Sequence, residues 1–215
     1  MSQELFDAMR QSVIDGDPDA AVELAQRSLA EGLDPLDAID KGYVPGLHEV
    51  GDEFSKGNMF LPEMMLAARA MQRAVAVLEP EMARRSSQRQ VTGRVVIGTV
   101  KGDIHEIGKS LVGMMLSADG FEVHDLGVDV PPERFVEKAR EVNADIVAIS
   151  ALLTTTMTGQ RTVVDALATA GLRPGVRVLV GGAPVTRSWA EEIGADGYGE
   201  DAVGAVKVAR ELVGA

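Results

Sequence analysis

The chain has 215 residues, of which 46% are hydrophobic and 25% charged, so it can form one large or two small globular domains. Its 33 acidic and 21 basic residues give a formal net charge of −12, which argues against a nucleic-acid-binding or anionic-membrane-binding surface. The absence of cysteine excludes disulfides, iron–sulfur clusters and thiolate metal sites, and without an export signal or a membrane-length apolar run we expect a cytoplasmic protein.

The first 84 residues are predicted to form a four-helix bundle. Apolar residues recur at helical spacing in four segments, which are 5–14, 18–32, 35–57 and 62–84. The second and third segments begin at Asp17-Pro18 and Asp34-Pro35, where the aspartate is a helix N-cap and the proline takes the first helical position. Short connections between amphipathic helices are typical of a bundle, so we assign residues 1–84 to one helical domain.

Residues 85–92 are mostly charged or polar and show no apolar period, so we assign them to a linker. Beyond them, short β-rich runs alternate with helical patterns. The expected strands are 94–100, 121–126, 145–150, 177–180 and 197–198, and the expected helices are 106–118, 132–143, 157–170 and 201–213. This alternation predicts an α/β domain over 93–215, with a doubly wound, five-stranded parallel sheet of Rossmann-like or flavodoxin-like type. Such sheets bind ligands beyond the carboxyl ends of their strands, here in the loops after Val100, Ser150 and Val180.

The first of these loops leads into Gly108-Lys109-Ser110 and so resembles the end of a phosphate-binding loop. The spacing excludes that interpretation, because the motif requires glycine at the position of Asp103. A carboxylate at that point would repel a phosphate. We therefore do not expect a nucleoside triphosphate site.

His105 is the candidate functional residue of the same loop. Asp103 lies two residues before it, close enough to accept a hydrogen bond from one imidazole nitrogen and leave the other free for a metal. Gly102 and Gly108 bracket the pair and allow a bulky group to approach. A histidine in such a loop is more often a surface or capping residue, but this one lies where the fold binds ligands.

One histidine is too few for a bare metal ion. Zinc needs three or four ligands, and His48 and His124 fall at no motif spacing from His105. A single axial histidine suits a metal that brings its own equatorial ligands. Haem and a corrin both fit that description.

The pattern Asp103-x-His105-x-x-Gly108, followed by Ser150-x-Leu152 and Gly181-Gly182, resembles the cobalamin-binding signature of methionine synthase, the mutases and the corrinoid proteins of methyltransferase systems. The resemblance implies that His105 replaces the cofactor's lower base on cobalt and that the nucleotide tail enters the sheet domain. The residues expected to act in the chemistry are His105, Asp103 and Thr156. Those expected to bind cobalamin in this domain are Gly102, Asp103, Ile104, His105, Ile107, Gly108, Ser150, Leu152, Thr154, Gly181, Gly182, Ala183, Tyr198 and Gly199.

The first domain shares the resemblance. Gly51–Phe54, Met59–Glu63 and Ala67–Met71 are similar to the helical cap of methionine synthase and corrinoid proteins. The resemblance implies that the bundle covers the upper, methyl-bearing face of the corrin, although a methionine-rich stripe is usually core packing. The residues that we place over the cobalt are Phe60, Met64, Ala67, Ala70 and Met71.

The implied function is that of a methyl carrier, because the chain shows neither the barrel of the mutases nor the substrate domains of methionine synthase. Cobalt(I) would take a methyl group from a donor on a substrate-specific methyltransferase and pass it to a thiol or tetrahydrofolate on an acceptor methyltransferase. A reductive activase is the third expected partner, and the cap would swing away about residues 84–92. The alternatives are a cobalamin-binding sensor or antirepressor in transcriptional regulation, and an unrecognised α/β binding protein.

Overall fold

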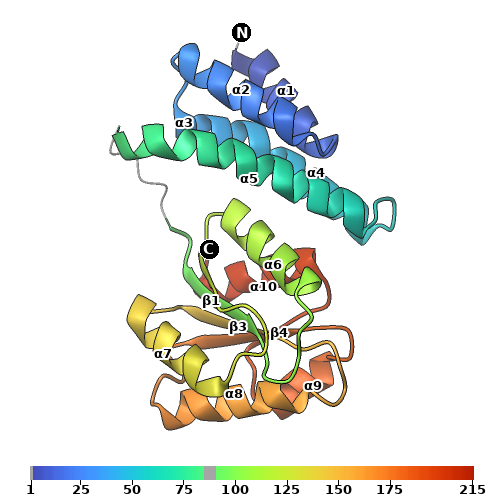
Figure 1. The fold of residues 1–215 in the computed structure, drawn as a ribbon, viewed down its shortest axis with the longest axis vertical. Coiled ribbons are helices and arrows are strands. Elements are labelled where there is room, and N and C mark those ends of the chain that lie inside the picture. Colours follow the sequence, from blue (N-terminus) through green and yellow to red (C-terminus); the bar gives the residue numbers. More distant parts are fainter. Residues whose placement is uncertain (1, 85–90) are drawn as a thin grey trace. The chain divides into compact units, whose positions relative to one another are not determined.

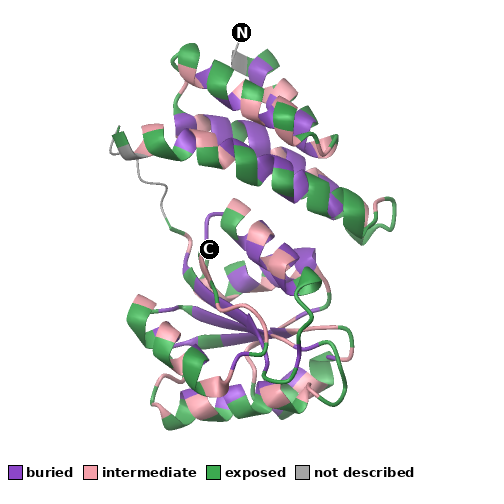
Figure 2. Ribbon diagram, in the orientation of Figure 1, coloured by how far each residue is buried: buried purple, intermediate pink, exposed green. Residues whose placement is uncertain are grey.

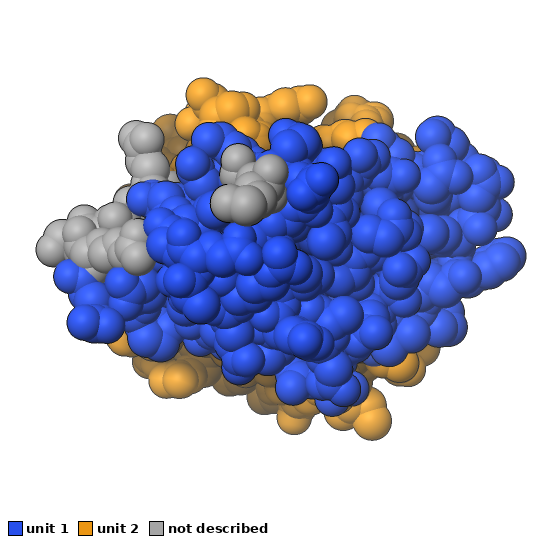
Figure 3. Space-filling view, turned by 90° about the horizontal axis from the view of Figure 1, so that it is seen from above, with its two compact units in different colours: residues 1–90 blue, residues 91–215 orange. Residues whose placement is uncertain are grey.

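The computed structural model describes residues 2–84 and 91–215. The chain divides into two compact units, residues 1–90 and 91–215 (Figures 1 and 3). Of the linker predicted at 85–92, residues 85–90 lie outside the described part of the chain. Within the described ranges, every helix is too short or too polar to cross a bilayer.

The described residues of the first unit form helical segments joined by short turns. They are α1 (Ser2–Ile14), α2 (Pro18–Ala30), α3 (Pro35–Asp37), the π-helical η1 (Ala38–Tyr43), α4 (Val44–Ser55) and α5 (Leu61–Arg84). Asp17 caps α2 by accepting hydrogen bonds from the backbone N–H groups of Asp19 and Ala20, each at 3.0 Å. Asp34 caps α3 in the same way through the N–H of Leu36, at 2.8 Å.

The single helix expected over 35–57 is wrong in one respect, because η1 interrupts it. The N–H of Val44 bonds to the carbonyl of Ile39, five residues back, in place of four. Pro45 follows and has no N–H to donate. The α-helical pattern resumes in α4, where Pro45 lies in the first turn and needs no acceptor for an N–H.

The second unit is a five-stranded parallel sheet in the order β2-β1-β3-β4-β5, which confirms the predicted fold class. The strands are β1 (Arg94–Thr99), β2 (Glu122–Asp125), β3 (Ile146–Ser150), β4 (Arg177–Gly181) and β5 (Gly197–Gly199). The helices are α6 (Ile107–Ala118), α7 (Pro132–Val142), α8 (Thr158–Thr169), α9 (Arg187–Glu192) and α10 (Ala202–Val213). Helices α6 and α10 cover one face, and α7, α8 and α9 cover the other (Figure 1). The sequence did not predict α9.

The central strands β1, β3 and β4 are mostly buried between the two helical layers (Figure 2). Val147 and Ile149 of β3 join Phe135 of α7 and Leu167 of α8 in one hydrophobic cluster. The intervening strand residues point to the opposite face, because side chains alternate along a strand. A sheet that is buried on both faces presents only its edges and strand ends to a ligand.

The register of the strands aligns the predicted binding loops. Thr99 pairs with Ser150, Ser150 pairs with Gly181, and Gly181 pairs with Gly199. These four residues form a row across β1, β3, β4 and β5 at the carboxyl end of the sheet. The chain reverses its winding between β1 and β3, which is where doubly wound sheets bind ligands.

Candidate functional site

Asp103 connects the loops that follow β1 and β3. Its side chain is buried, with 1% exposure for the residue. One carboxylate oxygen, Oδ2, accepts hydrogen bonds from the backbone N–H of Leu152 at 2.8 Å and from the hydroxyl of Thr156 at 2.7 Å. The other, Oδ1, accepts the backbone N–H of His105 at 3.1 Å and lies 2.7 Å from Nδ1 of the same histidine. Asp103 thus joins an imidazole to a loop 49 residues away.

The hydrogen bonds keep Asp103 ionised. Burial by itself raises the pKa of this carboxyl group. Donation from Thr156, from the N–H of Leu152 and from His105 outweighs burial and holds the pKa of Asp103 well below its usual range. An ionised carboxylate can only accept, so the hydrogen in its contact with His105 belongs to Nδ1. The lone pair of the imidazole is then on Nε2.

His105 presents that nitrogen from a fixed backbone. The hydroxyl of Thr99 donates to the carbonyl of His105 at 3.0 Å, and the histidine side chain is 46% exposed. No hydrogen bond among the described residues occupies Nε2. An oriented imidazole whose second nitrogen has no protein partner is arranged to bind a metal.

Exposed apolar side chains flank His105 along the chain and continue in the loop after β3, which Asp103 joins to it. Ile104 is 75% exposed and Ile107 56% exposed, and Leu152 and Leu153 are also exposed. Together these four residues form what we call the apolar rim. Several large apolar side chains left exposed on two joined segments are typical of a binding site.

The donor set fits a metal inside a macrocycle and does not fit a bare ion. Among the described residues, no group of three or more His, Cys, Asp or Glu side chains could hold a metal. His105 supplies one nitrogen, and the apolar rim supplies a surface for an organic ring. A metal at this position therefore needs a ring that provides its remaining ligands.

The loop after β4 requires a glycine where it meets the loop after β3. Gly182 has φ +128°, and a Cβ atom at this position would lie 1.8 Å from the carbonyl oxygen of Ala151. The loops after β3 and β4 therefore touch through their backbones. Gly181 and Gly199 lie beside this contact in paired strands, so little side-chain volume fills this end of the sheet.

The other predicted residues of the second unit lie in the same loops. Thr154 and Ala183 are exposed, whereas Ser150 and Tyr198 are partly buried. Gly108 lies in the first turn of α6 with no atom within 4 Å of a Cβ built there. The structure brings these residues to one end of the sheet, and their individual roles in binding stay predictions.

The predicted cap residues differ in exposure. Phe60 is 68% exposed, but Met64, Ala67, Ala70 and Met71 are fully buried. The four buried residues lie on α5, which packs against α2 and α4. They present no surface to a ligand in this structure, so their place over a cobalt stays a prediction. The large apolar residues of α5 that are exposed are Leu61, Met65 and Leu66.

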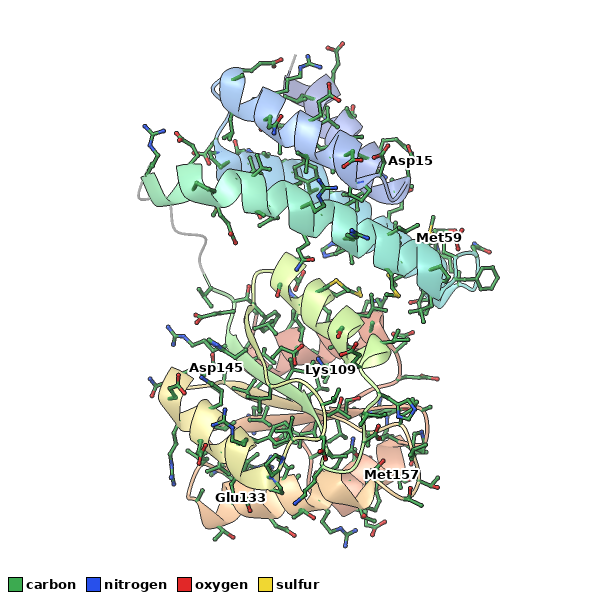
Figure 4. The ribbon with its side chains drawn as sticks, viewed as in Figure 1. Asp15, Met59, Lys109, Glu133, Asp145 and Met157 are labelled. Atoms are coloured by element: carbon green, nitrogen blue, oxygen red, sulfur yellow. The ribbon has the colours of Figure 1, made fainter. Side chains whose placement is uncertain are left out.

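The ammonium group of Lys109 is paired with a carboxylate of the same domain. This residue, labelled on α6 in Figure 4, is buried, and its ammonium group pairs with the carboxylate of Asp125 at the end of β2. The pairing agrees with the exclusion of a phosphate-binding loop from the spacing of its glycines.

Gln160 is a residue of the site that the sequence did not indicate. It is fully buried on α8, and its Nε2 donates to the carbonyls of Ile149 and Gly181 at 2.9 and 3.0 Å. Its Oε1 accepts a hydrogen bond from Nε1 of Trp189 at 3.0 Å. Gln160 therefore ties together the carboxyl ends of β3 and β4. The sequence did carry one indication that this glutamine is buried: it begins an apolar helical stripe that continues through Val163.

Comparisons with known proteins agree with this geometry. Residues 93–207 match a family model described as B12 binding domain, and residues 5–79 match a second model of the same description. A corrinoid protein of Desulfitobacterium hafniense is 46% identical over 215 residues, which is 100% of both chains. A trimethylamine corrinoid protein of Methanosarcina barkeri is 48% identical over 210 residues, 96% of this chain and 97% of the relative. In the crystal structure of the methanol:cobalamin methyltransferase complex of Methanosarcina barkeri, one chain is 31% identical with a TM-score of 0.85, covering 98% of this chain and 80% of that chain.

Proposed function

Because the chain belongs to the B12 binding domain family and binds cobalamin or a related corrinoid, we propose that it carries a methyl group on the cobalt between two methyltransferases. Full-length similarity to proteins named as corrinoid proteins supports the proposal. So does similarity to a chain of a methanol:cobalamin methyltransferase complex. The names of the curated relatives favour a methylated amine as the methyl donor.

The observation that carries the proposal is the orientation of His105 by Asp103. Nε2 of His105 would hold the cobalt, and the apolar rim would contact the corrin ring. The loops at Ser150, Gly181 and Gly199 take the nucleotide tail. When bound, the corrinoid supplies a cobalt centre that accepts and releases a methyl group.

Asp103 suits both states of the imidazole. While Nε2 holds the metal, the carboxylate accepts the Nδ1 hydrogen and strengthens Nε2 as an electron-pair donor. The same carboxylate would also keep the ring oriented when Nε2 holds no metal. Thr156 and the N–H of Leu152 hold the carboxylate in place in either state. We therefore assign ligand exchange at cobalt to His105, Asp103 and Thr156.

The proposed partners follow from the carrier role. A substrate-specific methyltransferase loads the methyl group, and a second methyltransferase delivers it to a thiol or tetrahydrofolate. A reductive activase, with a reductant of its own, would be the third partner. The chain supplies the corrinoid, and each partner supplies its own substrate site.

The test is histidine ligation measured by spectroscopy. Protein labelled with ¹⁵N-histidine is loaded with hydroxocobalamin, desalted and reduced to cobalt(II), and its electron paramagnetic resonance spectrum is recorded. We expect coupling to one histidine nitrogen in the wild type and in His124→Ala, and no such coupling in His105→Ala. His124 is a matched control because it lies on β2, where it contacts Glu122.

Two results would contradict the proposal. Protein that is colourless after desalting would not be a corrinoid protein, and retained coupling in His105→Ala would place the ligand elsewhere. Methyl transfer from a methylated amine with added methyltransferases then tests the carrier role. Light-dependent change of oligomeric state in an adenosylcobalamin-loaded form, without methyl transfer, would indicate the regulatory alternative.

A further inference from the structure

Asp129, in the loop between β2 and α7, binds the turn that carries His105. Its Oδ1 accepts a hydrogen bond from the backbone N–H of Gly102 at 2.7 Å. Its own N–H donates to the carbonyl of Asp103 at 2.9 Å. Asp129 therefore accepts from Gly102 and donates to the next residue, Asp103. Gly102 lies 27 positions earlier in the chain, in another loop.

The backbone of Asp129 is in an uncommon conformation. Among the described residues, only Asp129 and Asn143 have a positive φ without being glycine, at 54° and 51°. Asn143 is the C-cap of α7, where a left-handed residue is usual. Asp129 ends no helix. Non-glycine residues with such a backbone persist where their surroundings hold them, and they concentrate at functional sites.

The neighbours of Asp129 fix it to the sheet. The N–H of Val130 donates to the carbonyl of Thr99 at 3.0 Å, and Val130 forms a parallel bridge with Val100. Val130 is buried, whereas Asp129 is exposed. The side chain of Asp129 therefore does not fill the core, and the contact that it makes is the one to the turn.

That turn determines where Asp103 points. Gly102 has φ +83°, and the N–H of Asp103 bonds back to the carbonyl of Val100 at 3.1 Å. The reversal directs the Asp103 carboxylate inward, toward Leu152 and Thr156. Asp129 bonds to the chain on both sides of the peptide unit at which this direction is set.

We propose that Asp129 is a positioning residue for the cobalt ligand: it holds the Gly102–Asp103 turn and so prearranges Asp103 and His105 for the corrinoid. The inference rests on the proposed corrinoid site. Without the Asp129 carboxylate, the N–H of Gly102 bonds to water and the turn samples other conformations. The imidazole is then correctly placed in only a fraction of molecules, and the strength of ligation falls by that fraction.

Three variants separate this role from a general backbone effect. Asp129→Gly keeps access to positive φ and removes the carboxylate. Asp129→Asn keeps both the left-handed preference and an oxygen acceptor. Asn143→Gly makes the matching backbone change at the other positive-φ site, at the end of α7.

Two measurements report on the turn and on the ligand. In cofactor-free protein, we expect Asp129→Gly to raise the exchange rate of the Gly102 amide about tenfold or more, measured by NMR. In cobalamin-loaded protein, we expect a smaller fraction of cobalt(II) with histidine coupling and about tenfold faster loss of cofactor. For Asp129→Asn, both rates should stay within about threefold of the wild-type rates. Asn143→Gly should match the wild type in both measurements.

The outcomes distinguish this inference from the proposed function. Wild-type protein without histidine coupling would overturn both. Wild-type coupling together with wild-type amide exchange and ligation in Asp129→Gly would overturn the positioning role alone. Equal losses in Asn143→Gly would also overturn it, because the effect would then belong to the backbone in general.

Discussion

Replacing Asp103 by asparagine tests the central hydrogen-bond network without changing its shape. The carboxylate accepts two bonds at each oxygen, from Leu152 and Thr156 on one side and from His105 on the other. Asparagine has one acceptor oxygen and one NH₂ group. In either orientation, the NH₂ group faces a backbone N–H, that of Leu152 or that of His105, and leaves it without an acceptor.

The cost follows from these contacts. A buried donor without a partner costs about 1–3 kcal/mol, and hydrogen bonds to a charged acceptor are stronger than neutral ones by about 1 kcal/mol. We therefore expect Asp103→Asn to lower the free energy of unfolding of the second unit by about 2–4 kcal/mol at pH 7. The hydroxyl of Thr156 can rotate to accept from the NH₂ group, which limits the loss.

The effect depends on pH with a defined sign. The pKa of Asp103 is lowered in the folded state, so its carboxylate stabilises the protein fully above the unfolded pKa of about 4. That stabilisation is lost as the pH falls below about 4 toward the folded pKa. The stabilisation that depends on the ionised carboxylate of Asp103 should therefore shrink as the pH falls below about 4, and the difference between wild type and Asp103→Asn should shrink with it.

Trp189 gives the assay for this prediction. It is the only tryptophan of the chain and lies in the same unit as Asp103, so its fluorescence in urea follows the unfolding of that unit. The control is Asp165→Asn on α8, where the carboxylate is exposed. Equal urea midpoints for Asp103→Asn and Asp165→Asn at pH 7 would refute the reasoning, as would a difference that grows as the pH falls below about 4.

The remaining predictions concern residues near the hydrogen-bond network of Asp103. Thr156→Val should lower the free energy of unfolding by about 1 kcal/mol, and Thr156→Ser should restore it, as measured by urea unfolding. Gln160→Leu should cost about 1–3 kcal/mol and shift the emission of Trp189, whose indole N–H loses its acceptor; unchanged emission would contradict this. Gly182→Ala should prevent stable folding because its Cβ would overlap the carbonyl oxygen of Ala151. Gly108→Ala, at a helical position with open space around it, should instead raise the thermal midpoint of the cofactor-free protein.

The centre of the sheet was predictable because β1, β3 and β4 each contain an apolar run between turn residues. The predicted run 94–100 corresponds to β1 at Arg94–Thr99, and 145–150 corresponds to β3 at Ile146–Ser150. Such runs record burial on both faces, which is a local property of the sequence. By contrast, α9 has six residues and is too short to show a helical period.

The contacts that organise the site differ in the sequence separation of the residues that they join. Asp103 and His105 are two residues apart, so their hydrogen bond could be anticipated from spacing. The bond from Asp129 to Gly102 spans 27 residues and has no local pattern. The stripe on α5 could be recognised as apolar, but periodicity alone does not distinguish a side chain that packs against another helix from one that faces a ligand. Met64 is the example, since it is fully buried.

The apolar rim also has a thermodynamic consequence. Ile104, Ile107, Leu152 and Leu153 keep hydrocarbon in contact with ordered water while the protein is without its cofactor. Covering them with a corrin ring returns that water to the bulk. Cofactor binding should therefore have a negative heat-capacity change, and its enthalpy should become more favourable as the temperature rises.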